Sequence, residues 1–350
     1  MKIKNTFFKR VLIIIPVVFT VIFTLGLIQD KTGKNDSLKT VIKQKDIKSE
    51  PESESTGPDT VKIGAYVFSI YDLNFPGNKI NIDYYLWYNT VKDSLNLMEN
   101  FEAVNSIDFK KIGENNERRG DINYLTFRVN SQLKKEWDVT DFPFDKQHIE
   151  IIIEDSDKDN TELVFRADTI GSKLDPNVKI DGWEISDFKI RTVDYTYQTN
   201  YGDPDIPLNE YSSYSRVIVS FNIQRSGNGL FFKLFIGLFI SVLISLLTFF
   251  IDPVDLDPRF GLSVGAIFAA IASQYVITST LPQNARLTLV DKLHDIAFIF
   301  IFLCIVGSVV SLYLKKHDKI NSQKKLDKYG FYVLGISYVL IALFFILRAI

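Results

Sequence analysis

The sequence predicts an extracellular all-β sandwich joined to a four-helix transmembrane domain, with an extra hydrophobic helix at the N-terminus. Three observations support this fold class. Between residues 59 and 226, short runs rich in Ile, Val, Tyr and Phe are separated by Asn, Asp and Gly. Four long apolar runs follow within 227–350, and a fifth lies at 11–28. At about 1.5 Å per residue, helices of this length cross a bilayer core of about 30 Å.

The N-terminal segment, residues 1–28, has the pattern of an export signal. Four basic side chains in the first ten residues precede the uncharged apolar run at 11–28. This run is longer than the usual signal-peptide core and no small-residue cleavage pattern follows it. We therefore expect a membrane anchor, with a cleaved signal peptide as the alternative. Residues 29–58 are polar without an apolar period, which predicts a flexible tether.

Seven strands are predicted in the extracellular domain, residues 59–226. They lie at 61–73, 79–89, 121–133, 148–155, 162–168, 182–197 and 214–225. The turn at 74–78 contains Pro-Gly and joins the first two strands. Apolar Ile80 and Ile82 alternate with polar Asn81 and Asp83, so one face is expected to meet the core and the other water. Short strands with no helical period between them predict a β-sandwich.

The transmembrane domain, residues 227–350, is predicted to contain four spans. They lie at 230–251, 260–281, 296–314 and 331–347. The segment 314–328 is rich in lysine and is expected to be a cytoplasmic loop by the positive-inside rule. The basic N-terminus then lies inside, and the sandwich and the C-terminus lie outside. We expect a multi-pass protein of a bacterial inner membrane.

The second span is composed mostly of small and weakly polar residues, so it is expected to face protein or water rather than lipid. One stripe along it alternates spacings of four and three: Gly261, Gly265, Phe268, Ala272, Tyr275 and Ser279. Several copies of a helix turn such a stripe towards a common axis. The stripe is a candidate pore lining. The alternative is a tightly packed interior helix that uses its small residues to approach a neighbour.

Composition argues against several other classes of protein. The formal net charge of −2 gives no indication of nucleic-acid binding. The single cysteine, Cys304, cannot form an internal disulfide. The three histidines are scattered, and no metal-ligand spacing, phosphate-binding glycine loop or nucleophile motif is present. We expect no enzyme activity, no metal and no cofactor.

Several motifs extend this picture. The loop at 137–147 contains Phe-Pro-Phe-Asp at 142–145, Arg225 lies just before the first span, and Leu281-Pro282 closes the second. In this order, over roughly 61–350, the chain resembles the pentameric ligand-gated ion channels of the Cys-loop receptor superfamily. Lys134 and His148 stand where animal receptors have cysteines, so the chain resembles the disulfide-free, prokaryotic branch.

The resemblance implies a homopentamer in the lipid bilayer that passes cations and is gated by a small-molecule ligand or protons. Four residues would couple gating: Pro143, Asp145, Arg225 and Pro282. In the family, the loop at 137–147 and the turn at 74–78 meet the linker after the pore helix, here 283–292. Asp145 and Arg225 are candidates for an ion pair that ties the domains together. The alternative for Asp145 is a carboxylate that caps a turn.

The resemblance also places Asp257 at the cytoplasmic mouth of the pore helix. Five copies would form a carboxylate ring, which favours cation over anion passage. The alternative is a solvated loop residue, and Arg259 is able to neutralise part of its field. Five copies of Phe268 would form a hydrophobic ring that gates by dewetting.

In the family, the hairpin before the last strand of the sandwich covers a ligand pocket. Here it carries five tyrosines: Tyr195, Tyr197, Tyr201, Tyr211 and Tyr214. Their rings suit a small cation by cation–π attraction. The alternative is that they pack on the sandwich. A second interpretation of the whole chain is a non-conducting pentameric receptor or scaffold that signals through its cytoplasmic loop at 315–328.

Overall fold

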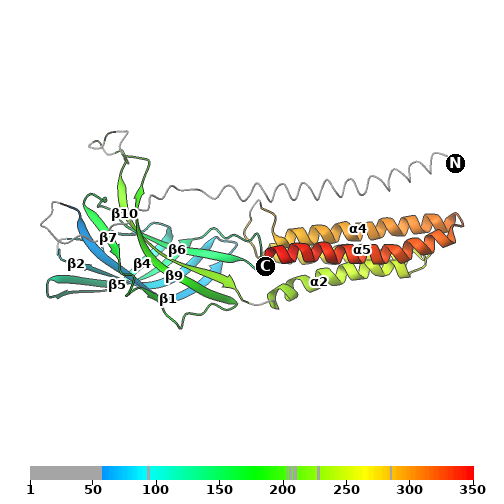
Figure 1. The fold of residues 1–350 in the computed structure, drawn as a ribbon, viewed down its shortest axis with the longest axis horizontal. Coiled ribbons are helices and arrows are strands. Elements are labelled where there is room, and N and C mark those ends of the chain that lie inside the picture. Colours follow the sequence, from blue (N-terminus) through cyan, green and yellow to red (C-terminus); the bar gives the residue numbers. More distant parts are fainter. Residues whose placement is uncertain are drawn as a thin grey trace. The chain divides into compact units, whose positions relative to one another are not determined.

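The computed structural model describes residues 57–92, 95–202, 204, 207, 211–226, 229–283 and 286–350. A sheet-rich domain is followed by four long apolar helices (Figure 1). This order agrees with the predicted fold class. The predicted anchor or signal at 1–28, and the tether at 29–58 as far as residue 56, lie outside the described residues.

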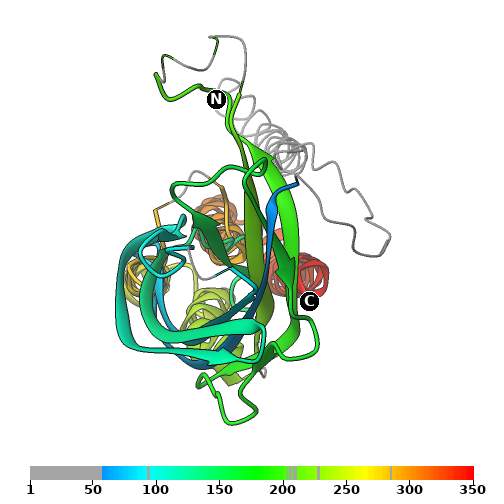
Figure 2. The same cartoon turned by 90° about the vertical axis from the view of Figure 1, so that its left-hand side faces the viewer.

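The β domain contains two sheets. Its strands are β1 (Asp59–Asn74), β2 (Lys79–Thr90), β3 (Phe101–Ala103), β4 (Ser106–Arg119), β5 (Ile122–Lys134), β6 (Lys146–Asp155), β7 (Leu163–Ala167), β8 (Lys173–Leu174), β9 (Trp183–Thr196) and β10 (Ser213–Arg225). The larger sheet has the order β4-β5-β2-β1-β7, with β8 beside β1, and the smaller has the order β3-β6-β10-β9. In Figure 2 the blue-to-teal strands β1, β2, β4 and β5 lie opposite the green strands β9 and β10.

Alternating burial in β2 follows the predicted pattern, with one exception. Ile80, Ile82 and Tyr84 are fully buried and Tyr85 is exposed. Asp83, which was expected to face water, is also buried, because Nη2 of Arg128 on β5 lies 2.9 Å from its Oδ2. A charged partner on the neighbouring strand thus lets a carboxylate occupy a covered position.

Strand β4 was not predicted from the sequence. Its side chains are mostly exposed, and the run KKIGENNERR has no apolar alternation. The strand forms because it pairs antiparallel with β5 along nearly its whole length. It lies at the edge of the sheet, where charged side chains also discourage pairing with another chain.

Four described helices are long and apolar enough to cross a membrane, as in a multi-pass membrane protein. They are α2 (Gly229–Leu246), continued by the 3-10 turn η1 (Leu247–Phe250), α3 (Leu256–Thr278), α4 (Leu289–Lys316) and α5 (Ile320–Ala349). Helix α4 begins earlier than its predicted span because Thr288 and Asp291 form a capping box at its N-terminus. The predicted loop at 314–328 is mostly helix, and residues 317–319 make the turn between α4 and α5.

Gly64 on β1 allows the indole of Trp87 to lie flat across the strand. The two residues are register partners, and an added Cβ on Gly64 would lie 2.2 Å from Cζ2 of Trp87. The indole Nε1 donates to Asp168 at 3.2 Å, and the Lys62 ammonium lies 3.1 Å from the same carboxylate. Desolvation raises the pKa of Asp168, but hydrogen bonds from the backbone of Gly171, from Lys62 and from Trp87 outweigh it, so the net pKa is lowered.

We predict that Gly64→Ala lowers the free energy of unfolding of the β domain by about 1–3 kcal/mol, because the added methyl group overpacks the site and displaces Trp87 from Asp168. All three tryptophans of the chain lie in the β domain, so denaturation of the full chain followed by tryptophan fluorescence reports on it. Thr60→Ala, at an exposed position of the same strand, is the control and should change stability by less than about 0.5 kcal/mol. Equal stability of the two variants would contradict the overpacking argument.

Candidate functional site

Helix α3 has two opposite faces. Its buried residues follow spacings of four and three along one side and are Arg259, Ser263, Ala266, Ala270 and Ile277. The predicted pore stripe begins two residues later and follows the same spacings. At about 100° per residue, an offset of two residues places the stripe about 200° from the buried face. The stripe therefore lies directly opposite the side by which α3 packs in the bundle.

All six residues of the stripe are exposed in the single chain. Phe268 is 65% exposed and Tyr275 is 74% exposed. An added Cβ at Gly261 or Gly265 would meet no heavy atom within 4 Å. Within one chain, these glycines are thus not needed for close helix packing, which was the alternative interpretation of the stripe.

The buried face of α3 begins with a charged residue, Arg259. Its side chain is fully buried, and Nη2 lies 2.8 Å from Oδ1 of Asp327 on α5. Nη1 donates to the carbonyl of Ile251 at 3.1 Å, and the Ser311 hydroxyl on α4 donates to Asp327 at 2.9 Å. Further along the same face, the hydroxyls of Ser263 and Ser245 lie 3.2 Å apart.

Asp257 lies on the first turn of α3 and is exposed. Arg259 was expected to be able to neutralise part of its field. Since the guanidinium of Arg259 points into the bundle and is paired with Asp327, it forms no ion pair with Asp257. No ion pair of Asp257 occurs within the described part of the chain, so its carboxylate is available at this end of the helix.

Helix α5 has a different exposed surface. In the most apolar 18-residue stretch of each helix, the buried share is 11% in α5, 22% in α3, and 39% in α2 and α4. Its exposed side chains are large and apolar, and include Val333, Ile336, Val339, Leu340, Leu343 and Leu347. Such side chains are suited to lipid, whereas the small and polar residues exposed on α3 are not. The two helices thus differ in the surroundings that their free faces require.

At the end of the β domain, Arg225 lies among aromatic rings and a carboxylate. Its Nε is 2.6 Å from Oδ1 of Asp145, whose side chain is 1% exposed. The guanidinium carbon lies 4.2 Å from the ring centroid of Trp183, 4.8 Å from Phe142 and 4.9 Å from Phe75. The structure thus brings together Asp145 and Arg225, together with three rings to which sequence reasoning assigned no contact with Arg225.

Each of the three rings around Arg225 comes from a different segment of the chain. Phe75 lies in the turn between β1 and β2, Phe142 in the loop before β6, and Trp183 begins β9. Phe75 also stacks on Trp137, with ring centroids 4.3 Å apart. Arg225 itself ends β10, four residues before α2 begins at Gly229. One guanidinium therefore packs against three segments of the β domain at the end of its last strand.

The loop before β6 also contacts the helices. The backbone N–H of Leu289, at the start of α4, donates to the carbonyl of Thr140 at 2.9 Å. The ring of Phe144 stacks on Phe231 in the first turn of α2, with centroids 5.5 Å apart. Pro143 lies between Phe142 and Phe144 in this loop, and Pro282 is buried after the end of α3.

Four of the five predicted ligand-binding tyrosines lie together. The ring of Tyr197 makes edge contacts with Tyr195, Tyr201 and Tyr214 at centroid distances of 4.8, 5.6 and 5.7 Å. Tyr211 is 53% exposed and has no ring contact among the described residues. The predicted aromatic cluster therefore forms without Tyr211.

A cation from the chain itself already occupies the tyrosine cluster. The guanidinium carbon of Arg216 lies 3.6 Å from the ring centroid of Tyr195, and its Nη2 donates to the Tyr197 hydroxyl at 3.0 Å. Nε of Arg216 is paired with Glu154, and the Tyr197 hydroxyl donates to the same carboxylate at 2.8 Å. Arg216 thus fills the place that the sequence suggested for a small cationic ligand.

Burial raises the pKa of Tyr197, and its hydrogen bond to Glu154 raises it further. Burial is also the main cause of the raised pKa values of Tyr201 and Tyr214. A tyrosine with its ordinary pKa of about 10 is already neutral at physiological pH, and the raised pKa values keep these three phenols neutral to higher pH. They offer rings and hydroxyl groups to a ligand, and no negative charge.

Sequence reasoning missed Glu154 and Arg216. A usable signal was present, because each is a charged residue in a predicted strand, directly beside the apolar run at 151–153 or at 217–219. Buried charges of opposite sign on neighbouring strands are expected to pair.

The described residues contain no group of three His, Cys, Asp or Glu side chains arranged to hold a metal ion. No protein-family model and no curated protein matches this chain.

We predict that Arg216→Ala lowers the free energy of unfolding by about 3–5 kcal/mol, because it leaves the Glu154 carboxylate buried without its partner. Methylguanidinium at millimolar concentration should restore part of this loss by entering the vacated space. Both effects are measured by denaturation of the full chain followed by tryptophan fluorescence.

The matched control for Arg216→Ala is Arg191→Ala, which breaks the exposed pair of Arg191 with Glu150 on the same sheet. Exposed pairs contribute about 0–1 kcal/mol, so this variant should change little and should not respond to methylguanidinium. If both variants lose the same stability, Arg216 does not form the buried pair that the geometry indicates.

Proposed function

We propose that this membrane protein is a homopentameric ligand-gated ion channel of a bacterial inner membrane, with a preference for cations. The observation that carries the proposal is the two-sided character of α3. One face packs in the bundle of its own chain, and the opposite face exposes glycine, alanine and serine with two aromatic rings. A transmembrane helix with that free face needs protein or water beside it. Five copies around an axis supply both.

In this assembly the residues of the stripe line the pore. Phe268 forms the hydrophobic ring that closes the pore by dewetting, and Asp257 forms the carboxylate ring at its mouth. The inward pairing of Arg259 with Asp327 supports the role of Asp257, because the nearest cation on the helix is already neutralised. Permeant cations are therefore concentrated at that mouth, and anions are repelled.

Gating is proposed to pass through Arg225 and the loop before β6. A ligand or proton that favours one packing of the β domain shifts a two-state equilibrium by its differential affinity for the two states. Asp145 and Pro143 belong to the loop whose Thr140 and Phe144 contact α4 and α2. Pro282 follows α3 in the segment that leads to α4. Displacement of this loop would therefore move α2 and α4, the two helices that pack against the pore helix α3.

The tyrosine cluster is proposed as part of the sensor. Since Arg216 already satisfies Tyr195 and Tyr197, a small cation would have to displace a paired guanidinium to bind there. A ligand that bridges Tyr201 and Tyr214 would act on the cluster without such a displacement. The occupied cluster favours this route over an ordinary amine site.

A second candidate is a non-conducting pentameric receptor or scaffold. Two observations favour it. The tyrosine cluster is filled by Arg216, and the pore stripe carries Gly261 and Gly265 in place of side chains that would replace the hydration of an ion. In that case a cytoplasmic partner would bind the basic start of α5 at 320–328. This segment is helical, although a loop was predicted there.

We predict that Asp257→Lys moves the reversal potential of reconstituted protein in a salt gradient from the cation value towards the anion value, because it reverses the sign of the ring. Asp257→Glu keeps the charge and should keep the wild-type reversal potential. If Asp257→Lys conducts with unchanged cation preference, the selectivity role of Asp257 is wrong. Absence of current from wild-type protein over a range of pH and added small amines would favour the scaffold.

A further inference from the structure

Two charged side chains lie within the helices that are long enough to cross a membrane and have no partner in the chain. Lys233 is on the second turn of α2, and Asp295 is on the second turn of α4. Both are exposed, and neither forms an ion pair with another described residue. An ionisable side chain at this depth is costly in lipid, so it is expected to face protein or water and to pair with an opposite charge.

The two charges lie at about the same depth. Phe235 follows Lys233 by two residues, and His294 directly precedes Asp295. The rings of Phe235 and His294 are in contact, with centroids 6.1 Å apart. At about 1.5 Å per residue, this contact places Lys233 and Asp295 within about 5 Å of the same level along the helices. A flexible lysine side chain is able to bridge such an offset.

Each of these charges points away from the bundle of its own chain. At about 100° per residue, an offset of two residues places a side chain about 200° from a given helix face. The residues two positions before and two positions after each charge are buried. They are Phe231 and Phe235 around Lys233, and Leu293 and Ala297 around Asp295. Because α2 and α4 pack by their buried faces, the two charges cannot meet within one chain.

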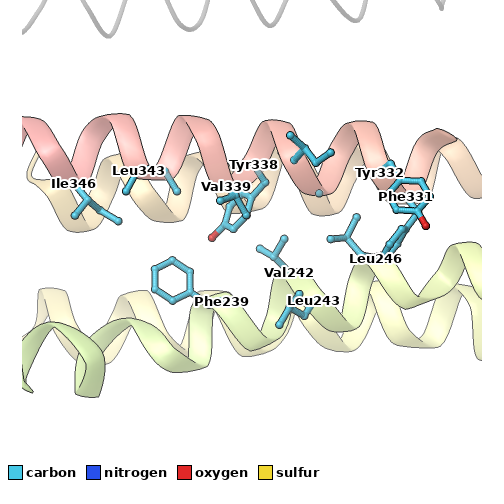
Figure 3. Close-up of a pocket in the computed structure, with 13 residues that line it drawn as sticks. Phe239, Val242, Leu243, Leu246, Phe331, Tyr332, Tyr338, Val339, Leu343 and Ile346 are labelled. Carbon is cyan, nitrogen blue, oxygen red and sulfur yellow. The ribbon is translucent and has the colours of Figure 1, made fainter. Parts of the chain in front are cut away.

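The surface around Lys233 differs from the side of the chain where α2 meets α5. On that side lies a groove of about 460 Å³, and none of its lining residues is charged (Figure 3). Lys233 lies outside this groove and is followed one turn later by Gly237. An added Cβ on Gly237 would meet no heavy atom within 4 Å. Since small residues on the surface of a transmembrane helix let another helix approach closely, Lys233 and Gly237 mark a place for a second helix.

The free side of α4 is a narrow stripe that contains Asp295. The exposed residues of this helix are Asp295, Phe302, Val309 and Lys316, and each follows the one before it by seven residues. The other residues of α4 are buried or half-buried. A spacing of seven residues is typical of the seam along which two helices pack. The stripe therefore has the form of a contact surface for one further helix.

We propose that Lys233 of one copy of the chain forms an ion pair with Asp295 of the next copy, where α2 of one chain meets α4 of its neighbour. The inference rests on the proposed assembly of copies around an axis. Both α2 and α4 pack against α3, so they are next to the neighbouring copies when the exposed face of α3 is turned to the axis. A contact between two different surfaces repeats head to tail and closes into a ring. Every copy thus gives its lysine to one interface and its aspartate to the other.

Disulfide formation between copies of the full chain tests the proposal in a Cys304→Ser background, which removes the single cysteine. On oxidation, Lys233→Cys/Asp295→Cys should give a ladder of linked chains up to the pentamer on a non-reducing gel. The matched control is Asp295→Cys/Phe344→Cys, which should give no ladder. Phe344 is exposed on α5, at a similar distance from the outer end of its helix. The proposal is overturned if the first pair links no faster than the control or links only within one chain.

Charge reversal tests the same pair without cysteines. Lys233→Asp and Asp295→Lys each place like charges at every interface. Each should raise the protein concentration needed for assembly at least about tenfold, as measured by mass photometry in detergent. The combined variant Lys233→Asp/Asp295→Lys restores opposite charges and should recover wild-type assembly, which also shows that the exchanged residues allow folding. If wild-type protein is a pentamer and the combined variant assembles no better than the single variants, the ion pair is wrong and the proposed function is unaffected. Wild-type protein that stays monomeric would contradict both.

Discussion

The buried ion pair between Arg259 and Asp327 determines which face of α3 is exposed on the outside of the helix bundle. A fully buried guanidinium is costly unless it is paired and hydrogen-bonded, and here it has a carboxylate on α5 and a backbone carbonyl. Rotation of α3 by half a turn would break this pair, turn Arg259 out of the bundle and bury the stripe. The hydrogen bond between Ser245 and Ser263 fixes the same orientation further along the helix. The stripe is therefore exposed because polar pairing holds the opposite side of α3 in the bundle.

A second guanidinium has a comparable position in the β domain. Arg225 is held by Asp145 and by the rings of Phe75, Phe142 and Trp183, so three segments of the chain are packed around one side chain. A packed polar and aromatic cluster of this kind has discrete arrangements and does not deform continuously, which is the property that a two-state switch requires. Arg216 with Glu154 forms a third buried pair, beneath the tyrosines. Arginine is thus the residue that fixes geometry at each functional position proposed for this chain.

Much of the fold could be predicted from periodicity and length alone. Alternation in β2 and unbroken apolar runs at the four helices are signals that burial imposes on every chain of this kind. Strand β4 could not be predicted, because its order comes from pairing with β5 and its own side chains carry no pattern. The helical start of α5 was missed for a related reason. Seven of its nine residues from Ile320 to Lys328 are polar. The helix is stabilised there by contacts of Gln323 and Asp327 with each other and of Asp327 with α3 and α4.

The candidate sites were predictable in part. Residues with a fixed spacing on one element, such as Gly265 and Ala272, could be assigned to one helix face from their spacing alone. Partners from distant segments could not, because no local pattern indicates that Arg259 will meet Asp327 or that Arg216 will meet Glu154. The sequence suggested an open aromatic cluster at Tyr195 and Tyr197, and only the fold shows that a cation already occupies it.

The most direct measurement of the central claim is the reaction of single cysteines with a charged, water-soluble thiol reagent during current recording, in a Cys304→Ser background. Gly265→Cys and Ala272→Cys should react at rates typical of exposed thiols and change the current. Ala270→Cys on the packed face of α3 and Leu340→Cys on α5 should react far more slowly. If Ala272→Cys reacts no faster than Leu340→Cys, or reacts without any effect on current, then α3 does not line a water-filled pore.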